Sequence, residues 1–326
     1  MPSSKIHILY ENQEWFEPLS QTLAEAHVPH EGWDLSEGYL DLNKTPPQGI
    51  FYSKMSASAH TRGHHHATDL AAAAFAWLET HGRRVINGSA VLNLELRKTA
   101  QYLALQKAGL RIPKTVAAQG KAAIAKTAKH FSFPFILKPN RGGKGIGVKL
   151  IYSQEELDHF LANTDLSEFT IDGLVLLQEY IQSPDQTITR MEFIGGKFYY
   201  AVRVDTGGGF ELCPADGCTI EGLACPVEGQ EEADAPRFTI IENFNIPELE
   251  TCVSFLAQNQ VEVAGIEFIS NEKGERLFYD VNTNTNYNTI AEREAGWKYS
   301  GMKRMCEFLK SELERNSGAR GIVIDP

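Results

Sequence analysis

Short apolar runs and longer amphipathic segments alternate along the first part of the chain. The short runs are β-prone and predict strands, at residues 5–10, 49–52 and 84–86. The longer segments predict helices, at residues 15–26, where Phe16, Leu19 and Leu23 share one face, and at the alanine-rich residues 67–80. The order strand, helix, strand, helix, strand is typical of an α/β domain with a parallel sheet, and we expect residues 1–90 to form it.

The loop after the second predicted strand, residues 53–66, is a candidate ligand site, because open α/β sheets bind ligands at the carboxyl ends of their strands. Its cationic candidates are His60 and Arg62, and an arginine suits a substrate carboxylate because the two groups pair through two hydrogen bonds. The alternative interpretation is a solvated loop whose histidines bind adventitious metal.

Helix and strand patterns continue through the rest of the chain. Helices are expected at residues 91–107, with Ser89 as N-cap, and at residues 121–130, 155–162 and 248–258. Strands are expected at residues 174–181, in a hairpin over residues 191–204 that turns at Gly195 and Gly196, and at residues 261–270 and 276–282. We expect residues 91–182 and 183–326 to form two further domains.

A glycine-rich stretch, residues 139–147, lies between an apolar run that ends at Lys138 and a second β-prone run, residues 148–152. This context predicts a hairpin tip, and it excludes the strand-to-helix turn of a Walker A loop or a dinucleotide fingerprint. Glycines have no Cβ, so the backbone N–H groups can approach phosphate oxygens. The alternative is an ordinary hairpin loop. The candidate phosphate-binding residues of this stretch are Arg141, Gly143, Lys144, Gly145 and Gly147.

Two predicted strands near the end of the chain carry acidic and amide side chains. A short turn between them would place Glu267 opposite Phe278, and side chains alternate along a strand, so Asp280 and Asn282 share that face. Two carboxylates and an amide oxygen suit Mg²⁺. The alternative is a solvated hairpin face, but the apolar residues before Glu267 and Asp280 favour a buried site.

Composition limits the classes of protein that need to be considered. The 326 residues are 42% hydrophobic and 22% charged, an ordinary globular balance that suffices for two or three domains. The net charge of −11 argues against a nucleic-acid surface, which needs a basic field. We expect no membrane span and no signal peptide, because no apolar run is long enough. The five cysteines are expected to be reduced thiols in a cytoplasmic protein.

Five motifs, taken in order, resemble those of the ATP-grasp carboxylate–amine ligases. The closest resemblance is to the branch that adds glutamate to ribosomal protein S6 and to related glutathione-synthetase-like enzymes. The motifs lie between about residues 93 and 282 and read RKTAQYLALQKAGLRIP, FPFILKP, RGGKGIGV, LLQEYI, and AGIEFI with LFYDVN. The resemblance implies an α/β ATP-grasp fold, in which an N-terminal pre-ATP-grasp α/β domain precedes two subdomains that hold ATP between them.

The resemblance also implies roles for individual residues. Lys98 and Lys138 would contact ATP, and the adenine-binding hinge would be formed by Gln178, Glu179, Tyr180 and Ile181. The implied metal ligands are Glu267, Asp280 and Asn282, with Mg²⁺ or Mn²⁺ as the ion, and Arg190 and Arg203 would hold the transferred phosphoryl group and the intermediate.

The chain departs from the family pattern after the metal-binding asparagine, where NTNTNYN replaces a Pro-Gly turn. Because this segment often faces the second substrate in the family, Asn284 and Asn286 are candidates to hydrogen-bond the polar ends of an amino acid. The acidic residue that usually holds the ribose has no firm match: Asp185 is nearby, but Ile188 stands at the expected spacing.

The implied activity is ATP-dependent joining of a carboxylate to an amine through an acylphosphate, with release of ADP and phosphate. An amino acid or short peptide is the expected substrate, and we expect a cytoplasmic homodimer without nucleic-acid or membrane partners. The alternatives are a small-molecule kinase on the same fold and a non-catalytic ATP-binding regulator. A third is a zinc-binding module at Cys213, Cys218 and Cys225, whose spacing lacks the C-x₂-C pairs of common zinc sites.

Overall fold

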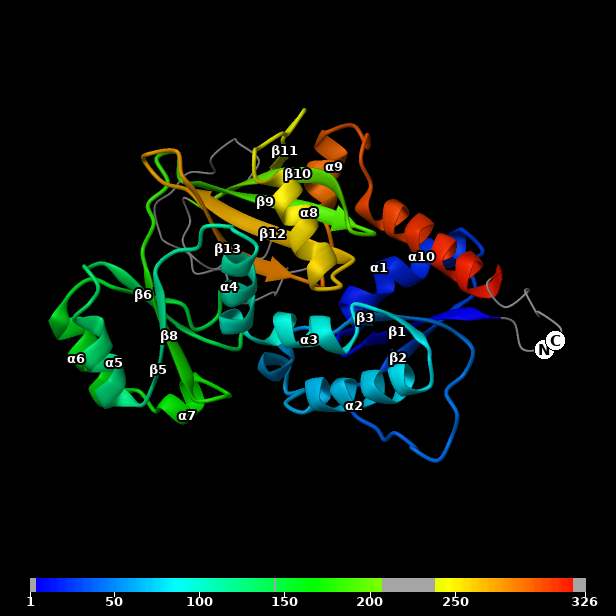
Figure 1. Cartoon of the computed structure of the whole chain (residues 1–326), viewed down its shortest axis with the longest axis horizontal. Coiled ribbons are helices and arrows are strands. Elements are labelled where there is room, and N and C mark those ends of the chain that lie inside the picture. The colour runs from blue at the N-terminus through cyan, green and yellow to red at the C-terminus, as the bar shows by residue number, and fades with distance from the viewer. Residues whose placement is uncertain (1–3, 144, 207–237, 319–326) are drawn as a thin grey trace.

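The computed structural model describes residues 4–143, 145–206 and 238–318. Lys144 and the three cysteines of the zinc alternative, Cys213, Cys218 and Cys225, lie outside these residues. Within them, three sheets with helices between and around them form the molecule (Figure 1). No helix in this part of the chain is long and apolar enough to cross a membrane.

The first sheet is parallel, as expected, and has the strand order β2-β1-β3-β4. Its elements are β1 (Lys5–Tyr10), α1 (Gln13–Glu25), β2 (His30–Asp34), β3 (Gly49–Lys54), the short 3₁₀ helix η1 (Ala59–Arg62), α2 (Ala67–Thr80) and β4 (Arg84–Ile86). The strands β1, β3 and β4 are the three that the sequence predicts. The sequence analysis did not identify β2, because its residues HEGWD are polar and half-exposed at the sheet edge.

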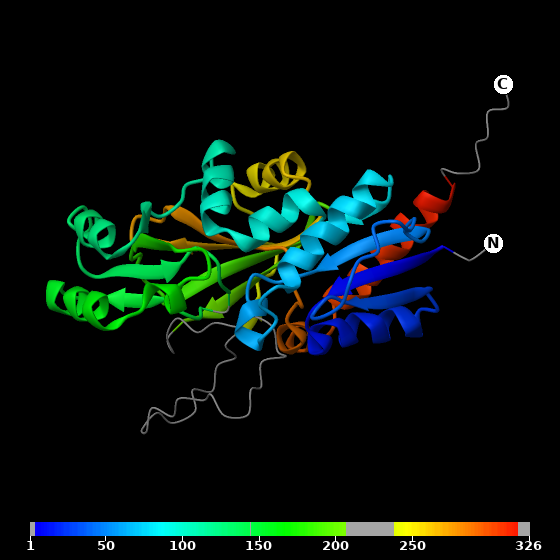
Figure 2. The ribbon, with the colours of Figure 1, turned by 90° about the horizontal axis from the view of Figure 1, so that it is seen from below.

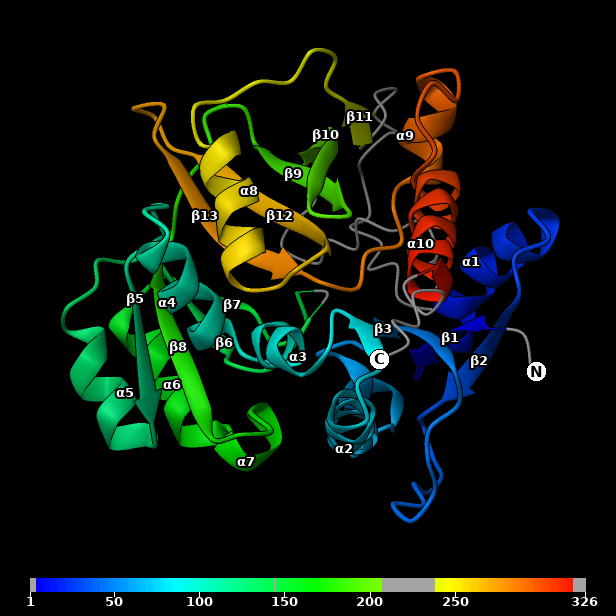
Figure 3. The same ribbon diagram turned by 45° about the vertical axis from the view of Figure 1, so that its right-hand side comes forward.

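The helices α1 and α2 cover opposite faces of this sheet. Side chains alternate along β1, so Ile8 packs with Leu19 of α1, whereas Leu9 packs with Phe75 of α2. The last helix of the chain, α10 (Gly301–Gly318), also packs against α1 and β3 (Figure 3). Its residue Leu309 is fully buried in the core on the α1 side. In this respect the expected domain of residues 183–326 differs from the structure, since its last helix completes the first layer.

The second sheet is antiparallel, with the order β5-β8-β6-β7. Its elements are β5 (Thr115–Gln119), α5 (Lys121–Ala128), β6 (Phe135–Pro139), β7 (Lys149–Ile151), α6 (Gln154–Asn163), α7 (Leu166–Phe169) and β8 (Leu174–Glu179). The strands β6 and β7 pair as the expected hairpin, and Leu137 and Phe135 are fully buried beneath α5 and α6.

The third sheet is antiparallel and has the order β11-β10-β9-β12-β13. Its elements are β9 (Thr187–Ile194), β10 (Lys197–Asp205), β11 (Phe238–Ile240), α8 (Leu249–Gln258), β12 (Val263–Ser270), β13 (Arg276–Asn282) and α9 (Thr289–Glu294). Helix α8 covers one face, and the hairpin of β9 and β10 turns at the predicted glycines.

The helix expected at residues 91–107 is two helices, α3 (Ser89–Leu96) and α4 (Lys98–Lys107), separated by Arg97 in an extended conformation. Both pack beside α8 on the third sheet (Figure 2). Asn140, at the end of β6, holds the start of α4: its backbone O accepts from Lys98 N at 3.0 Å and its Oδ1 accepts from Thr99 N at 2.9 Å. The break therefore makes Lys98 the first residue of a helix.

Candidate active site

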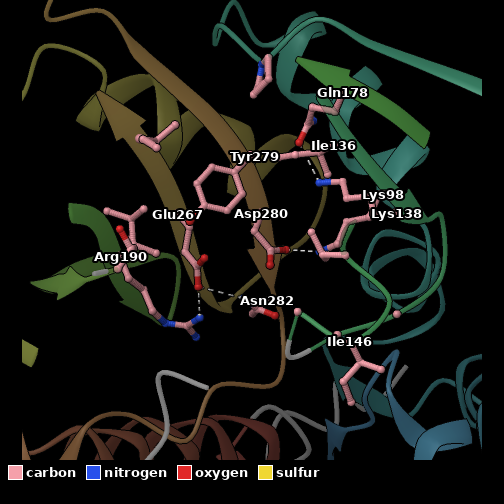
Figure 4. Close-up of a pocket in the computed structure, with 18 of the residues that line it drawn as sticks. Lys98, Ile136, Lys138, Ile146, Gln178, Arg190, Glu267, Tyr279, Asp280 and Asn282 are labelled. Atoms are coloured by element: carbon pink, nitrogen blue, oxygen red, sulfur yellow. Dashed lines mark hydrogen bonds and ion pairs between the residues drawn. The ribbon is translucent and has the colours of Figure 1, made fainter. Parts of the chain in front are cut away.

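A cavity of about 510 Å³ is lined by residues of the second and third sheets and by residues of the loop that follows β3 of the first sheet. Its walls include Ser56 and Ser58 from the loop after β3. Lys138 and Gln178 from the second sheet and side chains of β9, β12 and β13 line it as well (Figure 4). This size is in the usual range for small-molecule sites. Each segment that the sequence analysis named as a candidate site and that the structure describes contributes at least one residue to the lining of this cavity.

The two candidate metal-binding carboxylates face each other directly. Glu267 of β12 is paired with Asp280 of β13, so the predicted pairing of Glu267 with Phe278 is wrong. The reason is a β-bulge: Phe268 pairs with Phe278, and Tyr279 is the extra residue that shifts the register by one. The bulge turns two residues that would otherwise be diagonal into an opposed pair.

Arg190 of β9 is the cation on the Glu267 side of the pair. Its Nη1 donates to Glu267 at 2.7 Å, and its Nε donates to Glu192 at 2.6 Å. All three side chains are buried. Burial acts to lower the pKa of Arg190, but the two carboxylates raise it, so the guanidinium stays charged. Glu192 was missed by the sequence analysis, although it lies two residues after Arg190 and so on the same strand face.

The Arg190 guanidinium packs directly against the backbone at Gly265, which has no side chain. A Cβ at Gly265 would lie 2.3 Å from Nη2 of Arg190 and 2.4 Å from its Cζ. The glycine of the AGIEFI motif is therefore needed because the Arg190 side chain crosses β12 at this point.

Lys98 is the cation on the Asp280 side. Its Nζ forms an ion pair with Asp280, and both groups are largely buried. Burial acts to raise the pKa of Asp280, but the charge of Lys98 lowers it below its ordinary value. Burial likewise acts to lower the pKa of Lys98, and Asp280 raises it. Each carboxylate of the pair is thus held by one cation on its outer side.

The arrangement of this pair fits a divalent cation. Burial, and then the charge of Asp280, raises the pKa of Glu267 even though Arg190 opposes this, which marks a place where more positive charge would be stabilising. Asn282 adds an amide: its Nδ2 lies 3.5 Å from Glu267 Oε1. In the described part of the chain no group of three or more His, Cys, Asp or Glu side chains could hold a metal ion. An ion here would therefore be shared with amide and phosphate oxygens, as Mg²⁺ prefers.

Lys138 lies across the cavity from the carboxylates and has no carboxylate partner of its own in the described residues. Its Nζ donates to Tyr102 Oη at 2.6 Å and to Gln178 Oε1 at 3.0 Å. Burial, with the charge of Lys98, lowers its pKa to about 7. A buried ammonium without a counter-ion is costly, so this position favours an anionic ligand.

The residues expected at the hinge all reach the cavity, namely Gln178, Glu179, Tyr180 and Ile181. The glycine-rich hairpin, hereafter the flap (residues 140–143 and 145–148), borders the same space through Gly143 and Gly145. Gly145 and Gly147 have φ values of 75° and 79°, which favour glycine. Arg141 does not point at the cavity residues: its Nη2 donates to Thr68 Oγ1 of α2 at 3.1 Å.

Besides Arg141, three further expected site residues are not brought to the cavity. Arg203 pairs with Thr189 in the β9–β10 ladder, and so lies on the sheet face opposite Arg190. Arg62 is bound through two hydrogen bonds by the buried carboxylate of Glu11 and lies over the ring of Trp15. His60 Nδ1 contacts the backbone O of Ala57 at 3.1 Å. Glu11 could not be foreseen as the partner of Arg62, because 51 residues separate them.

Asn284 and Asn286 line the cavity, as expected. Sequence reasoning missed two residues that hold this region. Glu95 of α3 is buried and accepts from Ala57 N at 3.2 Å and from Thr283 N at 2.8 Å, which ties the loop after β3 to the end of β13. Lys54, the last residue of β3, donates to Asn286 Oδ1 at 2.8 Å. Glu95 precedes the expected ATP lysine by three residues, but nothing local predicts its partners.

Comparisons with known proteins agree with this geometry. The family described as "RimK-like ATP-grasp domain" matches residues 97–217. The α-aminoadipate–LysW ligase LysX of Sulfurisphaera tokodaii is 30% identical over 105 residues, which are 32% of this chain and 37% of LysX. The chain thus matches little more than a third of the length of that relative.

Solved structures match over nearly the whole chain. A RimK domain ATP-grasp protein from Sphaerobacter thermophilus has a TM-score of 0.63 at 14% identity and covers 94% of this chain and 99% of its own. The ATP-grasp ligase PsnB, solved with a minimal precursor, Mg and ADP, has a TM-score of 0.62 at 14% identity, with 96% and 99% covered. These likenesses confirm the expected ATP-grasp fold.

Proposed function

We propose that this chain, which carries a RimK-like ATP-grasp domain at residues 97–217 and has the ATP-grasp fold, is an ADP-forming ligase that joins a carboxylate to an amine. The observation that carries the proposal is the opposed pair of Glu267 and Asp280, with Lys98, Lys138 and Arg190 around it in one cavity. Buried cations and carboxylates at this density suit a nucleoside triphosphate with a metal ion, because the ammonium of Lys138, which has no carboxylate partner among the described residues, would be costly without an anionic ligand.

Mg²⁺, or Mn²⁺ in its place, would be held by Glu267, Asp280 and Asn282, and when bound it would neutralise charge on the phosphate oxygens. Lys98 and Lys138 would donate to phosphate oxygens, since both ammonium groups border the cavity. Gly143 and Gly145 would bring backbone N–H groups to the same oxygens. The segment from Gln178 to Ile181 would bind the base.

In the first step an oxygen of the substrate carboxylate attacks the γ-phosphorus of ATP, the bond to the β-phosphate oxygen breaks, and ADP leaves. In the second, the amine nitrogen attacks the acyl carbon, and phosphate leaves with the proton that the nitrogen gives up. Arg190 would stabilise the charge on the transferring phosphoryl group, while Glu192 and Glu267 keep the guanidinium in place. The hydrogen bond from Lys98 N to the backbone O of Asn140 fixes the start of α4 and so positions the Lys98 ammonium.

The substrate that we favour is an amino acid or a short peptide, because the wall formed by Asn284, Thr285 and Asn286 is polar and uncharged. LysX is named as a ligase of α-aminoadipate and LysW, and PsnB was also solved with a precursor peptide, which supports this class. A cytoplasmic location and a homodimer stay predictions.

The experiment is a screen for ADP and phosphate release with Mg²⁺-ATP and amino acids or dipeptides, alone and in pairs. Hydroxylamine added in place of the amine should yield a hydroxamate from the activated acid. The test variant is Asp280→Asn. The matched control is Glu275→Gln, because Glu275 lies exposed on the turn of the same hairpin, and its side chain pairs, within the described part of the chain, only with Arg111 and Asn271. The proposal requires turnover in the wild type and in the control and its loss in Asp280→Asn.

Other products would assign other functions. A stable phosphorylated compound without free phosphate would indicate a kinase, and AMP with pyrophosphate would indicate adenylation. Tight Mg²⁺-ATP binding without any turnover across the screen would indicate a regulator.

A further inference from the structure

Lys54 is a buried cation for which the proposed mechanism has no use. It ends β3, at the carboxyl edge of the parallel sheet, and it is only 2% exposed. Among the described residues its ammonium makes no ion pair, and its hydrogen-bond partner is Asn286 Oδ1 at 2.8 Å. Burial lowers its pKa to about 7. Fully buried lysines are rare unless they are paired, so this position calls for an anion.

The contact with Lys54 determines which end of the Asn286 amide remains available. An ammonium is only a donor, so the oxygen of the amide must face it. The Nδ2 group of Asn286 is then left as a pair of donors, with no partner among the described residues, on a side chain that lines the cavity. The charge of Lys54 polarises these N–H bonds and makes them better donors to an anion.

Asn284 completes the same wall with an acceptor. Its Nδ2 donates to the backbone O of Lys54 at 3.0 Å, whereas its Oδ1 is buried without a hydrogen-bond partner in the described structure. An unsatisfied buried oxygen costs free energy that a ligand N–H would recover. The cavity wall thus presents an orphaned acceptor and a cation-backed donor from side chains two residues apart.

We propose that Lys54 and Asn286 form a subsite for a carboxylate that the reaction leaves intact, so that the enzyme selects a substrate with a free carboxylate, such as an α-amino acid. Asn286 contacts that carboxylate, Lys54 is a positioning residue behind it, and Asn284 Oδ1 accepts from an N–H of the same molecule. The assignment rests on the proposed function. It adds a residue of the first domain to a specificity site that is otherwise built from the segment after β13.

The first experiment compares each accepted substrate with its primary amide, in which the spared carboxylate is uncharged. The wild type should show a KM at least about tenfold higher for the amide, the worth of one charge-assisted hydrogen bond. Lys54→Met should raise the KM for the acid about tenfold and bring the two values within about threefold of each other, with the KM for ATP within about twofold. Making the amide in turn from the amine substrate and from the acid substrate identifies which of them carries the spared carboxylate.

Lys5→Met is the matched control, because Lys5 lies at the amino end of the neighbouring strand β1, whereas Lys54 lies at the carboxyl end of β3. The ratio of the KM values for amide and acid in Lys5→Met should equal that of the wild type. Undiminished preference for the acid in a folded Lys54→Met protein would overturn the subsite, as would a wild type that accepts acid and amide equally.

A second measurement needs no substrate. Asn286→Asp places a carboxylate beside Lys54, so it should raise the midpoint of thermal unfolding by at least about 2 °C at neutral pH. A lower or unchanged midpoint would show that Lys54 needs no anion and would also overturn the inference. Absence of turnover with a raised midpoint would refute the ligase and leave the anion subsite standing, whereas turnover with unaltered selectivity in Lys54→Met would refute only the subsite.

Discussion

Replacing Gly265 with alanine should uncouple Arg190 from its two carboxylates without altering any charge. The new methyl would lie 2.3 Å from Nη2 and 2.4 Å from Cζ of Arg190, where non-bonded carbon contacts need about 3.5–4 Å. The guanidinium must therefore move by about 1 Å or more. Its hydrogen bonds of 2.6 Å to Glu192 and 2.7 Å to Glu267 would then stretch past the hydrogen-bonding range.

The expected cost follows from how buried charge pairs behave. Removing one partner of such a pair costs about 3–5 kcal/mol, and here the cation stays nearby, so we expect Gly265→Ala to lose about 2–3 kcal/mol of unfolding free energy. Denaturant unfolding followed by circular dichroism measures this directly. A displacement of about 1 Å at a group that holds the transferring phosphoryl should also lower kcat about 100-fold.

A double-mutant cycle separates the clash from other effects of the methyl group. In an Arg190→Met background the guanidinium is absent, so adding Gly265→Ala should cost less than about 0.5 kcal/mol more. An equal cost in both backgrounds, or a Gly265→Ala protein as stable and active as the wild type, would show that the glycine is not there to accommodate Arg190.

Four more predictions concern the cavity and its rim. Asp280→Ala should fold but bind Mg²⁺-ATP poorly, as measured by calorimetry; wild-type affinity would remove it from the metal site. Amide hydrogen exchange in the flap (residues 140–143 and 145–148) should slow when Mg²⁺-ATP is added, and unchanged rates would contradict a phosphate-binding role. The pKa of Lys54 is about 7 in the fold against an ordinary 10.5, so between these values the unfolded chain binds more protons and stability rises with pH. From pH 7 to pH 9 the wild type should therefore gain about 2 kcal/mol over Lys54→Met in denaturant unfolding, and parallel pH profiles would mean an ordinary pKa. Arg62→Ala should cost about 3 kcal/mol of stability, because it leaves the buried carboxylate of Glu11 with the His64 contact but without its arginine, while KM values stay within about twofold; a selective rise in one substrate's KM would return Arg62 to the site.

The sequence by itself determined most of the helices and strands and the order of the binding motifs along the chain. Strands β1, β3 and β4, the hairpin of β9 and β10, and the pair β6 and β7 follow from short β-prone apolar runs and from turn residues, which are local properties. The N-cap of α6 is equally local: Ser153 Oγ accepts from Glu156 N at 3.2 Å, three residues away. The motif order was enough to indicate the ATP-grasp fold.

The tertiary structure decided which of these side chains meet. A single extra residue, Tyr279, makes Asp280 rather than Phe278 the partner of Glu267, and alternation cannot reveal a bulge because both strands keep their period on either side of it. Arg62 binds Glu11, which is 51 residues away in the sequence. Arg203 lies on the sheet face opposite Arg190, because it pairs with Thr189 of the neighbouring strand. Lys54 meets Asn286 across 232 residues of chain. Periodicity reports which face a residue takes within its own element, whereas the partner on that face is determined by how separate elements pack, and that information is not local.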